Sequence, residues 1–274
     1  MMAEEQIWSS VRGVSEWEEM NPACRKTMED AHVAIDNFAG RPGQGLFAVF
    51  DGHGGRGIVD YLSKNFCNVL ETELGYDGGN RSINECLTSA YLITDIQTSQ
   101  EGLMSSGSTA ASCLIRTEEC GDANELRRVC YCANVGDTRA VLCRRGGTAQ
   151  RLTFDHKASD PSEIKRIEEA GGFILRKRVL GILSVSRSFG DHAMKKFVVA
   201  RPFTTTTMLT DTDRFLIVAC DGIWDVFTDE EAVTYVCEIL DEEKVPENEA
   251  ARRLVQEAIN RGSQDNVTVL IVYL

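Results

Sequence analysis

Two short, uninterrupted apolar runs constrain this chain most, because each has the length of a buried strand and each leads into Asp-Gly. The first covers residues 45–50 and precedes Asp51-Gly52, and the second covers residues 215–220 and precedes Asp221-Gly222. A carboxylate at the end of a buried strand is held rigidly, and the glycine after it lets the backbone turn tightly. A single Asp-Gly would more often be ordinary turn chemistry. Its repetition favours a site at the two strand ends.

The other periodic segments predict paired helices and antiparallel strands. Apolar spacing predicts helices over about 56–74 and 81–100, and capping signals predict three more that begin near Asp160, Thr228 and Pro246. Strand-like runs lie at 108–116, 128–133, 139–143 and 267–273, and the turn at 134–137 predicts a hairpin between the second and third of these. Two successive helices followed by strands do not fit a βαβ alternation. We therefore predict an α+β sandwich of antiparallel sheets covered by helices, built as one domain over residues 1–274 because no linker or repeat divides them.

Charge and composition argue against two classes of partner. The formal net charge is −13 and no long basic run occurs, whereas nucleic-acid binding needs clustered Lys and Arg. No stretch approaches the roughly 20 apolar residues of a membrane helix. The acidic start at residues 1–5 also lacks the pattern of a signal peptide. We predict neither a nucleic-acid nor a membrane partner.

The ten cysteines are expected to be free thiols. No CxxC pair occurs that would indicate a zinc ribbon. Five cysteines lie within apolar, strand-like runs, where a free thiol behaves as a small hydrophobe: Cys113, Cys130, Cys132, Cys143 and Cys220. This usage is typical of a reduced protein in the cytoplasm, the nucleus or both.

Further carboxylates lie in turns, in Gly136-Asp137, in Gly190-Asp191 and in Glu29-Asp30. Clustered carboxylates repel one another, and each desolvated one is costly unless a cation neutralises it. Hard oxygen ligands of this kind suit Mg²⁺ or Mn²⁺. Two such ions could share a hydroxide and clamp a phosphoryl group for in-line attack. The hypothesis requires that distant carboxylates converge in space.

Two basic side chains near these acids have a possible role in phosphate chemistry. His53 lies two residues after Asp51 on a glycine-flanked loop, and a histidine can protonate a departing alkoxide near neutral pH. The alternative is that His53 is simply exposed in a loop. Arg25 precedes Glu29-Asp30, and a guanidinium offers a fork to two phosphate oxygens. In isolation Arg25 would more often be a surface residue.

Other chemistries leave weaker traces or none. Gly52, Gly54 and Gly57 complete GxGxxG after a strand, but the acidic residue of a dinucleotide site should end a second strand about 20 positions later. Glu71 and Glu73 instead lie inside a predicted helix. No cysteine has an arginine six positions later, and neither Gly-Lys, HExxH nor GxSxG occurs. These absences exclude a cysteine-phosphatase loop, a P-loop and the common zinc-protease and serine-hydrolase motifs.

Eight segments taken in order resemble the metal-dependent protein phosphatases, the type 2C serine/threonine family. They cover residues 25–30, 50–55, 106–110, 134–139, 155–157, 185–191, 219–225 and 262–266. The resemblance implies a four-layer α-β-β-α sandwich, two antiparallel sheets flanked by antiparallel helix pairs, with a metal site at one end. It also implies a phosphatase for phosphoserine and phosphothreonine proteins that uses two Mn²⁺ or Mg²⁺ ions, with a weaker third.

The metal-binding positions of the family fall on acidic residues of this chain. The resemblance makes Asp51 the bridging ligand and places the Gly52 carbonyl on the second ion. Asp191 and Asp221 would bind the first ion. Glu29 would contact the second ion through water.

Three more acids belong to the expected site. Asp265 matches an acidic position near the first ion, and Asp137 matches the weaker third site together with Asp191. Asp30, next to Glu29, is another candidate metal ligand.

The resemblance also assigns the substrate-binding positions. Arg25 would bind the substrate phosphate, and His53 would be the general acid. Residues of about 157–185 match the flap of the family, on which substrate choice often depends, and Arg178 lies on it.

Departures from the family pattern affect the flap and leave substrate preference open. The usual proline is Ala158, the usual asparagine is Leu180 and the usual alanine is Ser184. A binding protein that had lost its metals should lack ligands, and here the ligands are present. A phosphatase for small phosphoesters remains the other rival, which activity on a phosphothreonine peptide against sugar phosphates would separate. We expect a monomer.

Overall fold

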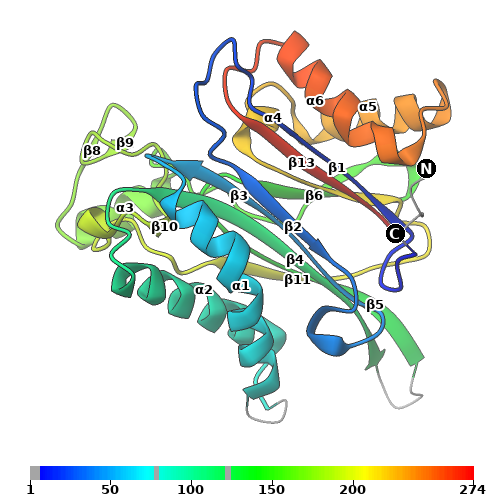
Figure 1. Cartoon of the computed structure of the whole chain (residues 1–274), viewed down its shortest axis with the longest axis horizontal. Coiled ribbons are helices and arrows are strands. Elements are labelled where there is room, and N and C mark those ends of the chain that lie inside the picture. Colours follow the sequence, from blue (N-terminus) through cyan, green and yellow to red (C-terminus); the bar gives the residue numbers. More distant parts are fainter. Residues whose placement is uncertain (1–6, 77–79, 121–124) are drawn as a thin grey trace.

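The computed structural model of the chain describes residues 7–76, 80–120 and 125–274. The acidic start at residues 1–5, on which the signal-peptide prediction depends, lies outside the described residues. The strands form two antiparallel sheets that face each other, with helices on both outer sides (Figure 1). The predicted α+β class is confirmed.

Each sheet brings together strands from both halves of the chain. The first has the order β1 (Gly13–Glu19), β13 (Val267–Tyr273), β12 (Phe215–Ala219), β6 (Arg139–Cys143) and β7 (Ala149–Arg151). The second has the order β11 (Phe203–Met208), β5 (Glu125–Val135), β4 (Gly107–Cys120), β3 (Gln44–His53) and β2 (Ala31–Ile35), with β10 (Phe189–Gly190) paired to β4. A separate hairpin consists of β8 (Ile174–Leu175) and β9 (Arg178–Val179).

The helices begin and end close to the predicted positions. They are α1 (Gly57–Gly75), α2 (Ile83–Gln100), α3 (Pro161–Glu169), α5 (Asp229–Asp241) and α6 (Ala250–Asn260), and a one-turn helix α4 (Asp221–Trp224) was not predicted. The Thr228 hydroxyl accepts from the backbone N–H of Glu231, as its capping signal predicts. Among the described residues, none of the helices combines the length and the apolar character needed to cross a bilayer.

The alternation of side chains along the central strands produces four layers. In β3, Leu46, Ala48 and Phe50 belong to the core beneath α1 and α2, whereas Phe47 and Val49 point into the core between the sheets. All five side chains are fully buried. Because successive side chains of β3 point alternately into two apolar cores, every residue in this part of the strand must be apolar.

The second apolar run has the same arrangement in the facing sheet. Ile217 and Ala219 of β12 pack in the core beneath α5 and α6, and Leu216 and Val218 point into the core between the sheets. The layers are therefore helices, sheet, sheet and helices, as the resemblance implies (Figure 1).

The predicted hairpin across residues 134–137 is wrong. β5 and β6 lie in different sheets: β5 pairs with β4 and β11, and β6 pairs with β12 and β7. Between them the chain crosses the sandwich, with Gly136 at φ 82°. Asn134 fixes this crossing, because its side-chain amide donates to Phe154 O and accepts from Phe154 N. The turn residues predicted a change of direction correctly but did not predict the partner strand.

Residues 157–185, which match the flap, leave the sandwich and return to it. A bridge between Lys157 and Val185 closes this segment, and α3 begins at the predicted cap, where Asp160 Oδ1 accepts from the backbone N–H of Ser162 and Glu163. A small apolar cluster that includes Ala158, Ile167, Val179, Met194 and Val198 lies beneath it. The single-domain organisation stays a prediction.

Glu163 anchors α3 to the sandwich through a buried ion-pair network. Its carboxylate is 2% exposed, accepts from Arg187 Nη2 at 2.6 Å and from Arg166 Nη2 at 2.9 Å, and also accepts from the Ser186 hydroxyl at 2.7 Å. Burial opposes the charge, but these hydrogen bonds outweigh it and lower the pKa of Glu163 to about 2.

Replacing Glu163 with glutamine should lower the free energy of unfolding by about 2–4 kcal/mol at pH 7, because the two guanidinium groups lose their counter-ion. A depressed pKa gives stabilisation that is present above the ordinary value of 4.5 and is lost as the pH falls toward 2. The difference between wild type and Glu163→Gln should therefore narrow below about pH 5. Urea unfolding measures it. The control is Glu169→Gln, whose carboxylate is 68% exposed, with an expected change within about 0.5 kcal/mol. Equal effects of the two variants would contradict the network.

Candidate metal centre

Three carboxylates from distant segments meet at one end of the sandwich. Asp51 lies near the end of β3, Asp137 follows β5 at the crossing between sheets, and Asp221 opens α4 directly after β12. One oxygen of each lies within 4.8 Å of those of the other two. The convergence that the sequence hypothesis required is present for these three residues.

The three carboxylates repel one another in a poorly hydrated place. Burial, followed by repulsion from Asp221, raises the pKa of Asp51 well above its ordinary value. Burial and then repulsion from Asp137 have the same effect on the pKa of Asp221. Burial raises the pKa of Asp137 to about 6, against the influence of Lys157, whose Nζ is 4.0 Å from an Asp137 oxygen. One lysine at that distance does not neutralise the cluster.

Asp30, directly before β2, is a further buried acid that lies outside the group of three converging carboxylates. It is 2% exposed, its Oδ2 has no hydrogen-bond partner, and burial raises its pKa to about 7. Three converging carboxylates without a matching positive charge are a donor set of the kind that hard divalent cations take. The residues present therefore fit such a cation.

The two Asp-Gly glycines are required for a reason other than a tight turn. A Cβ on Gly52 would lie 2.3 Å from the backbone oxygen of Glu29, and a Cβ on Gly222 would lie 2.2 Å from that of Asn266. Neither glycine has a positive φ, and Gly52 lies within β3. The expected turn is absent at Gly52, and the glycines instead allow two backbone segments to approach the strand ends closely.

A pocket of about 250 Å³ lies over the cluster. Besides the three carboxylates, its walls include Arg25, Glu29, Gly52, His53, Arg178 and Asp265. Arg25 donates from Nη2 to an Asp265 oxygen at 2.5 Å and from Nε to Gln264 O at 3.2 Å, and its side chain is 49% exposed. Arg178 donates to Ile182 O at 2.7 Å, which ties it to the flap.

His53 is held in place by Asp191. Its Nε2 lies 2.9 Å from Asp191 Oδ2, which also accepts from the Ser188 hydroxyl at 2.5 Å. Burial opposes the charge on Asp191, but the bond with His53 outweighs it and lowers the pKa of Asp191. A Cβ on Gly107 would lie 2.4 Å from His53 Nε2 and 2.3 Å from Asp191 Oδ2. The absence of a side chain at Gly107 therefore leaves room for the contact between the imidazole and the Asp191 carboxylate.

The family model described as "Protein phosphatase 2C" matches residues 18–267, which include every residue of this site. The chain belongs to the protein phosphatase 2C family. It is a metal-dependent protein serine/threonine phosphatase.

Relatives and solved structures agree along most of the chain. "Protein phosphatase 2C homolog 1" of Saccharomyces cerevisiae is 42% identical over 264 residues, which cover 94% of this chain and 92% of the relative. A protein of the same name from Schizosaccharomyces pombe is 39% identical, over 94% of this chain and 72% of the relative. A solved structure of a C. elegans sex determining protein superimposes with a TM-score of 0.84 at 27% identity, over 97% of this chain and 65% of that chain.

Asp191 lies outside the group of three converging carboxylates in the phosphatase site. The described residues that form the cluster within 4.8 Å are Asp51, Asp137 and Asp221, and Asp191 is not among them. Its carboxylate is directed to His53 and Ser188, and its backbone is left-handed, with φ 50°. The place of Asp191 at the first ion and that of Asp137 with Asp191 at a third stay predictions, and the structure brings Asp137 together with Asp51 and Asp221.

Asn266 is a residue to which the sequence assigned no role in the phosphatase. Its side-chain oxygen accepts from the backbone N–H of Glu29 at 2.8 Å, and its Nδ2 donates to Met20 O and Thr27 O at 2.8 and 3.0 Å. Asn266 therefore fixes the segment that carries Arg25 against Asp265, its neighbour in the chain. The only sequence signal was its position in the matching segment 262–266.

Proposed function

We propose that this phosphatase hydrolyses phosphoserine and phosphothreonine esters of proteins with two Mg²⁺ or Mn²⁺ ions and a weaker third. The observation that supports this most is the cluster of Asp51, Asp137 and Asp221, whose oxygens lie within 4.8 Å of one another next to Arg25 in one pocket. These carboxylates would hold the ions, with the Gly52 carbonyl and Glu29 on the same wall. The ions supply Lewis-acid activation of water and neutralise charge on the phosphoryl group.

The side chains of the pocket bind and orient the phosphoester. The half-exposed guanidinium of Arg25 faces the pocket, where it offers its donors to phosphate oxygens. Asp265 accepts from Arg25 and limits the directions that the fork can take. Arg178, on the flap segment, lines the same pocket and adds a second positive charge to it. The two arginines would attract the phosphoryl group, while Asp51 and Asp221 would hold the ions.

His53 transfers the proton that the leaving group needs. It lines the pocket, and Asp191 orients its ring through the 2.9 Å contact. A serine or threonine alkoxide is a poor leaving group, so that protonation by a positioned acid lowers the barrier. Asp191 thus acts as a positioning residue for His53.

The proposed metal dependence is tested by removal of the ions. The purified phosphatase should release phosphate from a phosphothreonine peptide with Mn²⁺ or Mg²⁺, lose this activity in excess chelator, and regain it when either ion is added back, since the clustered acids need a cation. Circular dichroism in chelator checks that the fold persists. Full activity in excess chelator would contradict the metal mechanism. Preference for sugar phosphates over the peptide would contradict the protein substrate.

Replacing His53 with glutamine should slow the phosphothreonine peptide by about 100-fold, because the alkoxide must then leave unprotonated. An activated aryl phosphate, whose leaving group needs no acid, should slow by less than about threefold. Asp191→Asn should show the same dependence on the leaving group with a smaller amplitude. Steady-state kinetics on both substrates give the comparison, and equal slowing of the two would refute the acid role.

We also propose that the phosphatase is a monomer in the cytoplasm, the nucleus or both. The cysteines whose side chains the structure describes are all free thiols, which suits a reducing compartment. The net charge of −13 favours neither nucleic acid nor anionic lipid as a partner. Light scattering tests whether the protein is a monomer, and imaging of a tagged chain tests its location.

A further inference from the structure

Two cysteines, one in a strand and one in a helix, lie side by side away from the metal centre. Cys143 ends β6 and Cys237 lies in α5, and their sulfur atoms are 3.8 Å apart. Cys143 is paired with Phe215 at the start of β12, whereas Asp221 follows the other end of that strand. Cys143 is fully buried, and Cys237 is partly exposed. Cys237 is therefore the only one of the two residues that has exposed surface.

A glycine turn lies next to Cys237. A Cβ on Gly147, between β6 and β7, would lie 3.8 Å from Cys237 Sγ. Since Gly147 has φ 79°, the turn favours glycine there, and no side chain projects from this position toward the sulfur.

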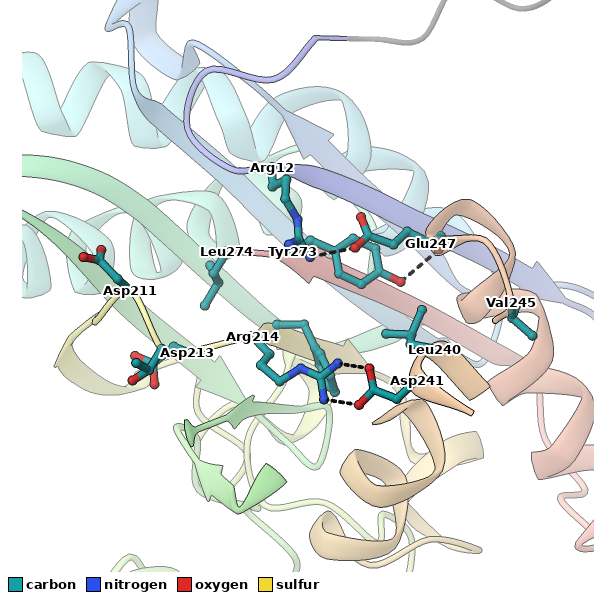
Figure 2. A pocket seen from close by; sticks show the side chains of 12 residues that line it. Arg12, Asp211, Asp213, Arg214, Leu240, Asp241, Val245, Glu247, Tyr273 and Leu274 are labelled. Carbon is teal, nitrogen blue, oxygen red and sulfur yellow. Dashed lines mark hydrogen bonds and ion pairs between the residues drawn. The ribbon is translucent and has the colours of Figure 1, made fainter. Parts of the chain in front are cut away.

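A guanidinium is fixed against the Cys237 sulfur. Arg214 Nη1 donates to Cys237 Sγ at 3.2 Å, while its two terminal nitrogens donate to the two oxygens of Asp241, each at 2.7 Å (Figure 2). The fork holds Arg214 in this position. Arg214 and Asp241 line a polar pocket of about 410 Å³. In Figure 2, Arg12 and Tyr273 lie on another side of this pocket.

The neighbours of Cys237 stabilise its thiolate. The hydrogen bond from the Cys143 thiol, and then the charge of Arg214, lower the pKa of Cys237 to about 7, against burial and against Asp241. For Cys143, the same contact and its burial raise the pKa. The pair therefore has one nucleophilic sulfur and one protonated partner within reach.

We propose that Cys237 and Cys143 are a hydroperoxide-reactive thiol pair that closes to a disulfide. The Cys237 thiolate attacks one peroxide oxygen, an S–O bond forms, the O–O bond breaks, and hydroxide leaves from hydrogen peroxide. The Cys143 sulfur then attacks the sulfenic acid, the S–S bond forms, and its thiol proton leaves with the hydroxyl group as water. Each sulfur loses one electron and the peroxide gains two.

Closure needs only a small approach, because the sulfur atoms must move from 3.8 Å to about 2.05 Å. The bond would tie α5 to β6 through the outer core. Cys113 and Cys132 have even closer sulfur atoms, at 3.0 Å, but both are almost fully buried in the core between the sheets and are not open to a reagent. Cys113 and Cys132 therefore serve as a control pair, which tests whether oxidation depends on solvent access as well as on the distance between the sulfur atoms.

The test treats the fully reduced, full-length protein with equimolar hydrogen peroxide, blocks remaining thiols, and maps linked peptides by mass spectrometry without reductant. A Cys143–Cys237 link should accumulate before oxidation of the exposed Cys24. Cys237→Ser should abolish the link, and Cys143→Ser should leave a sulfenic acid at Cys237 that dimedone traps. Arg214→Gln should slow the link several-fold. Phosphatase activity of the linked protein should stay within about twofold, since the link lies at the other end of β12 from Asp221.

A link between Cys113 and Cys132 that forms first, or oxidation of Cys24 before any link at Cys237, would overturn the proposal. Both results come from the wild-type protein, so they do not depend on whether the serine variants fold. The inference is independent of the proposed function, because the readout is a bond and not turnover.

Discussion

Replacing Asp51 with asparagine should lower kcat/KM on a phosphothreonine peptide by about 10³-fold or more, equivalent to about 4 kcal/mol of transition-state stabilisation. Asp51 lies in the cluster with Asp137 and Asp221, and asparagine keeps its shape while it removes the charge. The two remaining carboxylates would hold a cation more weakly. Part of the lost activity should therefore be restored at high Mn²⁺ concentration. Steady-state kinetics over a range of Mn²⁺ concentrations measure both effects.

Asp51→Asn should not destabilise the protein without metal. In the absence of a cation, Asp51 is repelled by Asp221, Asp30 and Asp137, and the substitution removes that repulsion. Urea unfolding in chelator should therefore give a stability equal to or above that of wild type. Asp211→Asn is the matched control, since it removes one negative charge from an exposed residue in the pocket of Figure 2. Its kinetics should stay within about twofold. Unaltered kinetics in Asp51→Asn would overturn the assignment of the cluster.

Local patterns predicted the secondary structure well because local physics determines it. The cap at Asp160 and the helix-forming signal at Thr228 depend on side chains within three residues of the backbone groups that they satisfy. The prediction that β5 pairs with β6 was wrong because pairing is not determined locally. A turn at 134–137 limits the direction of the chain, but the choice of partner strand depends on contacts with β4 and β12, which no local pattern contains.

The site shows the same division between residue type and position. Asp51 and Asp221 were recognisable because each follows an apolar strand, and both reach the cluster together with Asp137. Asp191 follows a glycine, as Asp137 does, yet its carboxylate contacts His53. The partners of the Asp191 carboxylate, His53 and Ser188, are brought to it by the fold, and its left-handed backbone is likewise a property of the folded loop.

The role of Gly52 could not be predicted from the sequence either. The group that excludes a side chain there is the carbonyl of Glu29, which only the fold brings close. A turn and a close approach both favour glycine. The two explanations differ in what an alanine would disturb: a turn would be strained only locally, whereas a close approach would transmit the displacement to the segment that carries Arg25.

Replacing Gly52 with alanine should therefore reduce kcat/KM by about 10²- to 10³-fold, because the new methyl group must displace the Glu29 backbone and, with it, the phosphate-binding arginine. The methyl group would lie 2.3 Å from Glu29 O and 2.6 Å from Val59 Cγ2, so a loss of about 1–3 kcal/mol in the free energy of unfolding should accompany it. Raising the Mn²⁺ concentration should restore less activity than in Asp51→Asn, because every carboxylate is still present and the defect is one of position.

The same substitution at Gly75 separates the close approach from a general effect of alanine. A Cβ on Gly75 meets nothing within 4 Å, and its φ is not in the left-handed region. Gly75→Ala should leave kinetics within about twofold and either preserve or raise the stability slightly, since alanine restricts the unfolded chain. If Gly52→Ala kept both wild-type turnover and wild-type stability, the Glu29 segment would have to move without consequence, and the close approach would have no part in holding Arg25 over the three carboxylates.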